Sequence, residues 1–122
     1  MIDKEIAISL LQDVLNLLSS PNKYIPGLLY GVNKQNRIVS SWSANACKWS
    51  LLGAIERVCI DNECSNNILL IIKELQNNCD KNICEFSKVC SYEQAIFLIK
   101  KTLNDLEFIP MIEESNLIYL GA

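Results

Sequence analysis

The pattern of apolar and polar residues predicts a mainly α-helical chain with one irregular stretch. Apolar residues recur every three or four positions over about residues 3–18, 43–59, 66–77 and 92–106, which is the spacing of amphipathic helices. Between the first two helices, segments 28–32 and 37–39 flank a polar turn at 33–36 and predict a short β-hairpin. Because two strands alone are marginally stable, the hairpin should pack against the helices. We expect a compact bundle of four principal helices.

The second predicted helix, residues 43–59, is the one around which the others should be organised. Ser43 is its expected N-cap, and the small residues Ala46, Ser50, Gly53 and Ala54 form one row along it. A Gly inside a helix costs roughly 1 kcal/mol relative to Ala. Gly53 is therefore expected where another backbone passes close to this helix.

The last predicted helix has the clearest boundary. Ser91 and Gln94 form a capping box, in which each side chain bonds the backbone amide of the other residue. Its expected inward residues are Ala95, Leu98, Ile99, Thr102 and Leu106. Residues 83–89, just before it, are ambiguous between a loop and a short strand.

We predict a single helical domain, residues 1–122, with 108–122 as an apolar tail. Pro110 discourages the preceding helix from continuing past about Leu106. The tail either lies back across the bundle or packs on a second copy. We favour the second alternative, which gives a homodimer.

Composition and charge restrict the classes of partner. No apolar run reaches the roughly 18 residues needed to span a bilayer, and the acidic, amphipathic N-terminus is unlike a secretory signal. We therefore expect a cytoplasmic protein with no membrane partner. The formal net charge of −3 argues against binding nucleic acid, which needs a basic face.

The absence of His excludes several kinds of chemistry. Ser–His and Cys–His nucleophiles, imidazole bases and His-ligated metals are all ruled out. The four Gly residues are scattered, so there is no Gly-rich phosphate loop. We expect no catalytic residues and no cofactor, although an enzyme using carboxylates or a thiol remains the least favoured alternative.

Two cysteine pairs raise the question of a metal site. Both pairs have the same spacing and flank the third predicted helix, and four thiolates can bind zinc: Cys59, Cys64, Cys79 and Cys84. This spacing is looser than that of common zinc sites, and free Cys is often simply buried. We expect no metal and keep the zinc set as the alternative.

The irregular stretch is where a binding surface is expected, because long loops in compact domains often carry function. Its candidate contact residues for a ligand or partner are Tyr24, Tyr30, Arg37 and Trp42. On the central helix, Glu56 and Arg57 are further candidates that could pair with Tyr30 or Arg37 and line a pocket. The simpler interpretation is that the aromatic residues cover the core and the charged pair faces solvent.

The segment Ala46-Cys47-Lys48-Trp49-Ser50-Leu51-Leu52-Gly53-Ala54-Ile55 resembles the signature of a small family of bacterial and phage proteins of unknown function. Members carry a helix reading Ala-x-x-Trp-Cys-x-x-Gly-Ala-Ile/Leu, and Ser50 stands here in the Cys position. The resemblance implies a mainly helical fold and a phage or mobile-element setting, but no activity.

The sequence therefore favours a small, non-enzymatic interaction protein. In the setting that the resemblance implies, it would bind and modulate a host protein. The alternative is a protein that binds a small ligand, for example a nucleotide signal, between the 24–42 loop and the central helix. A deep pocket lined by Arg37, Arg57 and aromatic residues would favour this alternative.

Overall fold

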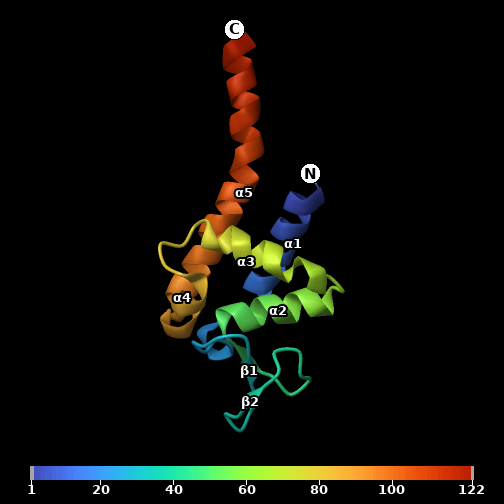
Figure 1. Ribbon diagram of the computed structural model, residues 1–122, viewed down its shortest axis with the longest axis vertical. Coiled ribbons are helices and arrows are strands. Elements are labelled where there is room, and N and C mark those ends of the chain that lie inside the picture. The colour runs from blue at the N-terminus through green and yellow to red at the C-terminus, as the bar shows by residue number, and fades with distance from the viewer. Residues whose placement is uncertain (1, 122) are drawn as a thin grey trace.

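The computed structural model describes the backbone of residues 2–121 and the side chains of residues 4–107. Within these residues it has five α-helices and three short strands (Figure 1). The elements are α1 (Ile2–Leu17), η1 (Pro21–Lys23), β1 (Gly31–Val32), β2 (Ile38–Val39), β3 (Lys48–Trp49), α2 (Leu51–Asp61), η2 (Ser65–Asn67), α3 (Ile68–Gln76), α4 (Ile83–Val89) and α5 (Tyr92–Gly121). The expectation of a mainly helical fold is confirmed, but the bundle has a fifth helix and the hairpin has a third strand.

The core lies where α1, α2, α3 and α5 meet (Figure 1). Fully buried side chains come from all four helices: Leu11 and Val14 from α1, Leu51 and Ile55 from α2, Ile71 and Leu75 from α3, and Ile99 and Thr102 from α5. The strands lie together beyond one face of α2, at the end of the molecule opposite α3 (Figure 1).

The central helix is shorter than predicted, and its N-cap is Ser50 rather than Ser43. The Ser50 hydroxyl accepts a hydrogen bond from the Gly53 amide at 3.0 Å and donates one to the carbonyl of Leu28. Just before it, Trp49 lies in β3 and is buried in the core. The chain is extended here because Trp49 pairs with β1, which overrides the helical spacing of the small residues.

The close backbone expected at Gly53 is present. It is the backbone of Tyr30, just before β1: a Cβ on Gly53 would overlap the carbonyl oxygen of Tyr30. This approach sets the sheet directly against the first turn of α2.

The predicted hairpin is confirmed as β1 and β2, which pair antiparallel on either side of the turn at 33–36. The third strand, β3, pairs antiparallel with the other edge of β1, giving the sheet order β2-β1-β3. The prediction missed β3 because Lys48 and Trp49 had been assigned to the central helix.

Residues 83–89 form the helix α4, so both predictions for this segment, loop and strand, are wrong. Asn82 caps the helix: its side-chain oxygen accepts from the amides of Cys84 and Glu85 at 3.0 and 3.2 Å. Ser87 is fully buried and donates from its hydroxyl to the carbonyl of Gly27 at 2.6 Å. The Ser87–Gly27 contact and the Asn82 cap together stabilise α4, which is too short to show a clear helical repeat of apolar residues.

The capping box before α5 is confirmed in both directions, at 2.9 Å and 3.1 Å between Ser91 and Gln94. All five residues expected to face inward on this helix are buried. The helix does not end near Leu106, since its bounds are Tyr92–Gly121. The expectations for the packing of the apolar tail and for a homodimer through it concern side chains 108–122, which lie outside the described residues.

None of the helices in the described part of the chain has both the length and the apolar character needed to cross a bilayer.

Candidate interaction surfaces

Of the predicted contact residues, Tyr24 is part of the core. Its hydroxyl donates to the carbonyl of Cys90 at 2.7 Å and lies 3.0 Å from the Cys90 sulfur. Its ring packs on that of Tyr92, with 5.9 Å between the centroids. Burial, and then the hydrogen bond to Cys90, raise the pKa of Tyr24 well above its ordinary value. Tyr24 therefore fixes the loop to the start of α5.

Tyr30 also has a structural role. Its hydroxyl donates to the carbonyl of Pro26 at 3.2 Å, within the same loop. Its backbone carbonyl faces Gly53. Its side chain is only half-buried, but the contacts of the residue hold the loop against α2.

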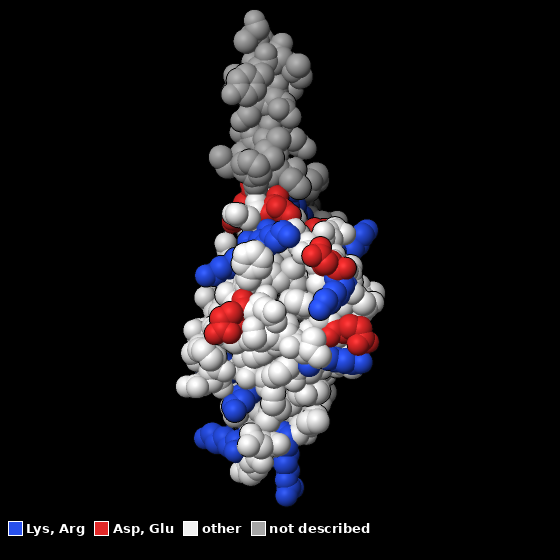
Figure 2. Space-filling model, turned by 90° about the vertical axis from the view of Figure 1, so that its left-hand side faces the viewer, with Lys and Arg blue, Asp and Glu red and all other residues white. Residues whose placement is uncertain are grey.

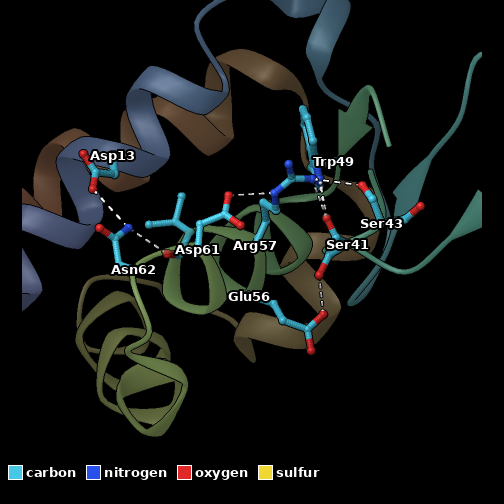
Figure 3. A network of polar contacts seen from close by, with 9 residues as sticks. Asp13, Ser41, Ser43, Trp49, Glu56, Arg57, Asp61 and Asn62 are labelled. Atoms are coloured by element: carbon cyan, nitrogen blue, oxygen red, sulfur yellow. Dashed lines mark hydrogen bonds and ion pairs between the residues drawn. The ribbon is translucent and has the colours of Figure 1, made fainter. Parts of the chain in front are cut away.

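Arg57 is at the centre of a polar network that joins α2 to the segment before β3 (Figure 3). Its Nε lies 2.8 Å from Asp61, one helical turn along α2. Its Nη1 donates to the carbonyls of Ser41 and Ser43 at 3.2 and 3.1 Å. The guanidinium also lies over the Trp49 ring, 5.4 Å from its centroid. These partners are not the Tyr30 or Arg37 that the sequence suggested.

Glu56 binds the same segment. Its Oε1 accepts from the hydroxyl of the fully buried Ser41 at 2.5 Å, and the carbonyl of Ser41 accepts from the Trp49 indole at 2.8 Å (Figure 3). Glu56 and Arg57 thus hold the 41–43 segment in place and are half-buried, not an exposed helix face.

Arg37 and Trp42 are the two predicted contact residues that face solvent. Arg37 follows the hairpin turn and is exposed, and Trp42 is 56% exposed. The structure therefore separates the predicted set into four residues that shape the loop and two that are exposed.

A hollow lies elsewhere, between α4, the first turns of α5 and the loop at 78–81. It has a volume of about 560 Å³. We call it the α4–α5 groove. Its apolar lining residues are Phe86, Val89, Cys90, Phe97 and Leu98. Figure 2 looks onto the α4 side of the molecule and shows an uncharged area bordered by charged side chains on both sides.

Two features of the α4–α5 groove matter for binding. Phe97 is 68% exposed and Val89 is 72% exposed, although both line the hollow. Charged residues of both signs also line it: Asp80, Lys81, Glu93 and Lys101. This surface was not predicted from the sequence. The available signal was Phe97, a large aromatic residue outside the inward stripe of α5.

The cysteines do not assemble the alternative zinc set. Across the described residues, no cluster of three or more His, Cys, Asp or Glu side chains could hold a metal ion. Cys59 is fully buried and Cys84 is exposed. Burial, with a smaller contribution from Cys64, raises the pKa of Cys59 to about 11. Burial also raises the pKa of Cys90, so both thiols stay protonated near neutral pH.

A second hollow, of about 460 Å³, lies between the hairpin turn and residues 44–47. Its lining is polar and includes Asn33, Lys34, Gln35 and Asn45. Neither of these two hollows is lined by Arg37 or Arg57, the two Arg residues expected around a small ligand.

Comparison with known proteins gives no match to a family model, to a curated protein or to a solved structure.

Proposed function

We propose that this chain is a small, non-enzymatic interaction protein that binds a partner protein in the α4–α5 groove. The observation that carries the proposal is the exposure of Phe97 and Val89, at 68% and 72%, on the walls of an apolar hollow of about 560 Å³. Large apolar side chains grouped at a concave site mark an interaction surface, because leaving them in water is unfavourable.

The arrangement of the groove supports a protein as the occupant. Protein interfaces combine an apolar centre with a polar rim, and aromatic residues in pockets carry much of the binding energy. Here Phe86, Phe97 and Leu98 supply the apolar centre. Lys101 and Glu93 supply charges of both signs that can orient a partner. A partner segment would place apolar side chains in the hollow and polar groups along its rim.

The chemistry of the two buried thiols, Cys59 and Cys90, does not favour a catalytic role for them. A reactive Cys needs a lowered pKa or an adjacent base. Burial raises the pKa of both Cys59 and Cys90, and the chain has no His that could act as a base.

Site-specific photo-crosslinking tests the proposal. The full chain is produced in its native cell with p-benzoylphenylalanine in place of Phe97. The control carries the same group in place of Leu69, which is 78% exposed on α3 and outside the groove. We expect a protein that crosslinks from position 97 and not from position 69.

The crosslinked protein is then purified and its affinity measured by calorimetry. We expect Phe97→Asp to weaken binding by more than about tenfold and the matched Leu69→Asp to change it by less than about twofold. The proposal fails if position 97 crosslinks nothing beyond the products of position 69. It also fails if the two Asp variants bind equally well.

A further inference from the structure

Charge is unevenly distributed between the sheet and the helical body. Residues 14–55, which include all three strands, hold four of the eleven Lys and Arg residues and none of the fourteen Asp and Glu residues. This stretch therefore carries +4, and the rest of the chain carries −7. In Figure 2 the lower end, where Figure 1 places β1 and β2, shows Lys and Arg but no Asp or Glu. We call the four cations, Lys23, Lys34, Arg37 and Lys48, the basic end.

Exposed apolar side chains come from the same part of the chain. Four of the seven large hydrophobic residues exposed among the described side chains lie between residues 28 and 42. They are Leu28 at 39%, Leu29 at 46%, Ile38 at 69% and Trp42 at 56% exposed. The stretch of chain that supplies the basic end therefore exposes apolar side chains as well as cations.

This surface is held in shape before any partner arrives. The side-chain oxygen of Asn33 accepts from the amides of Gln35 and Arg37 at 2.9 and 3.0 Å, which fixes the hairpin turn. Between β2 and β3, the segment that leads to β3 is held by Arg57 and Glu56. Preorganisation of this kind lowers the entropy lost on binding.

From these observations we infer that the basic end is a second binding site, which takes an acidic protein segment that also carries apolar residues. Its cations complement carboxylates, and a partner's apolar residues would cover Ile38 and Trp42. The site does not share lining residues with the α4–α5 groove and stands independently of it.

A protein segment fits this surface better than the other polyanions. Interfaces with nucleic acid are strongly polar. Of the exposed apolar side chains here, Trp42 could stack on a base, but Leu28, Leu29 and Ile38 offer no stacking platform or phosphate contact. A lipid surface would cover the apolar side chains. It would make no use of the adjacent polar hollow, where the Asn33, Gln35 and Asn45 amides can bond a peptide backbone.

The test uses the full chain and three defined probes. They are a peptide of alternating Glu and Leu residues, a single-stranded oligothymidine, and vesicles rich in phosphatidylglycerol. Binding is followed by fluorine NMR of the fluorotryptophan-labelled protein, which has only Trp42 and Trp49. The charge-reversal variant is Lys34→Glu with Arg37→Glu. Its matched control, Lys73→Glu with Lys100→Glu, changes two exposed cations of the helical body by the same charge.

We expect the peptide to shift the Trp42 resonance and to bind less tightly as salt is raised from about 50 to about 300 mM. The basic-end variant should weaken peptide binding by at least about tenfold, and the control variant by less than about twofold. The inference is overturned if the peptide does not bind or if both variants weaken it equally. It is also overturned if the oligonucleotide or the vesicles bind at least as tightly as the peptide. Circular dichroism verifies that both variants are folded.

Discussion

At Ser50 and Gly53, two small residues join the sheet to the central helix. The Ser50 hydroxyl caps α2 while it donates to the carbonyl of Leu28. Gly53 leaves room for the carbonyl of Tyr30. A helix start and a strand start are thus coupled through one hydroxyl and one missing side chain, and substitution at either position should affect both elements.

Gly53→Ala distinguishes this contact from intrinsic helix propensity. Propensity alone would stabilise the protein by about 1 kcal/mol. We expect destabilisation by about 1–3 kcal/mol, because the new Cβ collides with the Tyr30 carbonyl, and a greater loss for Gly53→Leu. Urea denaturation measures the difference. An increase in stability in the Ala variant would show that the Tyr30 backbone can move away at little cost.

Arg57→Lys should lower the free energy of unfolding, although the substitution keeps the positive charge. Lys keeps the cation but cannot donate to Ser41 and Ser43 while it covers the Trp49 ring. We expect the free energy of unfolding to fall by about 1–3 kcal/mol and the fluorescence of Trp49 to change. Arg37→Lys, at an exposed position, is the control and should change stability by less than about 0.5 kcal/mol. Equal effects of the two substitutions would contradict the network's role.

The buried thiol of Cys59 gives a pH dependence whose sign follows from its raised pKa. Below the ordinary thiol pKa, Cys59 is neutral in both the folded and the unfolded state. Above it, the unfolded state ionises, whereas the folded state does not until about pH 11. Stability should therefore fall as the pH rises from about 8.5 to about 11.

Cys59→Ala is expected to be less stable near neutral pH and to show a shallower decline in alkali. Denaturant midpoints measured across this range, with the exposed Cys84→Ala as control, provide the test. A decline equally steep in Cys59→Ala and in the unmodified chain would show that the thiol ionises alike in both states.

Among the elements, α4 depends most on its cap, since it has only seven residues. Asn82→Ala removes the acceptor for two amides and should lower the free energy of unfolding by about 0.5–2 kcal/mol. Hydrogen exchange should show faster opening in residues 83–89 than in α1. Asn66→Ala, at an exposed position of η2, is the control. Unchanged exchange in α4 would mean that the Ser87 contact alone holds the helix.

The sequence predicted the elements that have a clear local signal. The first helix, the third, the start of the last and the hairpin all follow from periodicity, turn residues or the capping box. Residues 43–50 were assigned to the central helix because Ala46, Ser50 and Gly53 also suit a helix. The pairing of Trp49 with Gly31, which makes this stretch extended, is a contact between residues far apart in the sequence. Likewise, the burial of Ser87 against Gly27 cannot be seen locally.

For the whole molecule, the sequence located part of one proposed binding surface and did not predict the other. Arg37 and Trp42 were identified as contact residues and are exposed at the basic end. The net charge of −3 is a sum over the whole chain, so it does not reveal that residues 14–55 hold cations and no Asp or Glu. The α4–α5 groove could not be predicted, because α4 was not recognised and the groove exists only once α4 packs beside α5. The exposure of Phe97 indicates a binding surface only when the side chains around it are known.

Fluorine NMR on the whole chain tests the proposed function most directly. The protein has three Phe residues, and two of them, Phe86 and Phe97, line the α4–α5 groove. The chain is labelled with para-fluorophenylalanine and titrated with the partner that crosslinks from position 97. The two groove resonances, assigned with Phe86→Leu and Phe97→Leu, should shift until the partner is saturating. If both resonances stay unchanged at saturation, the partner binds elsewhere and the groove is not the interaction site.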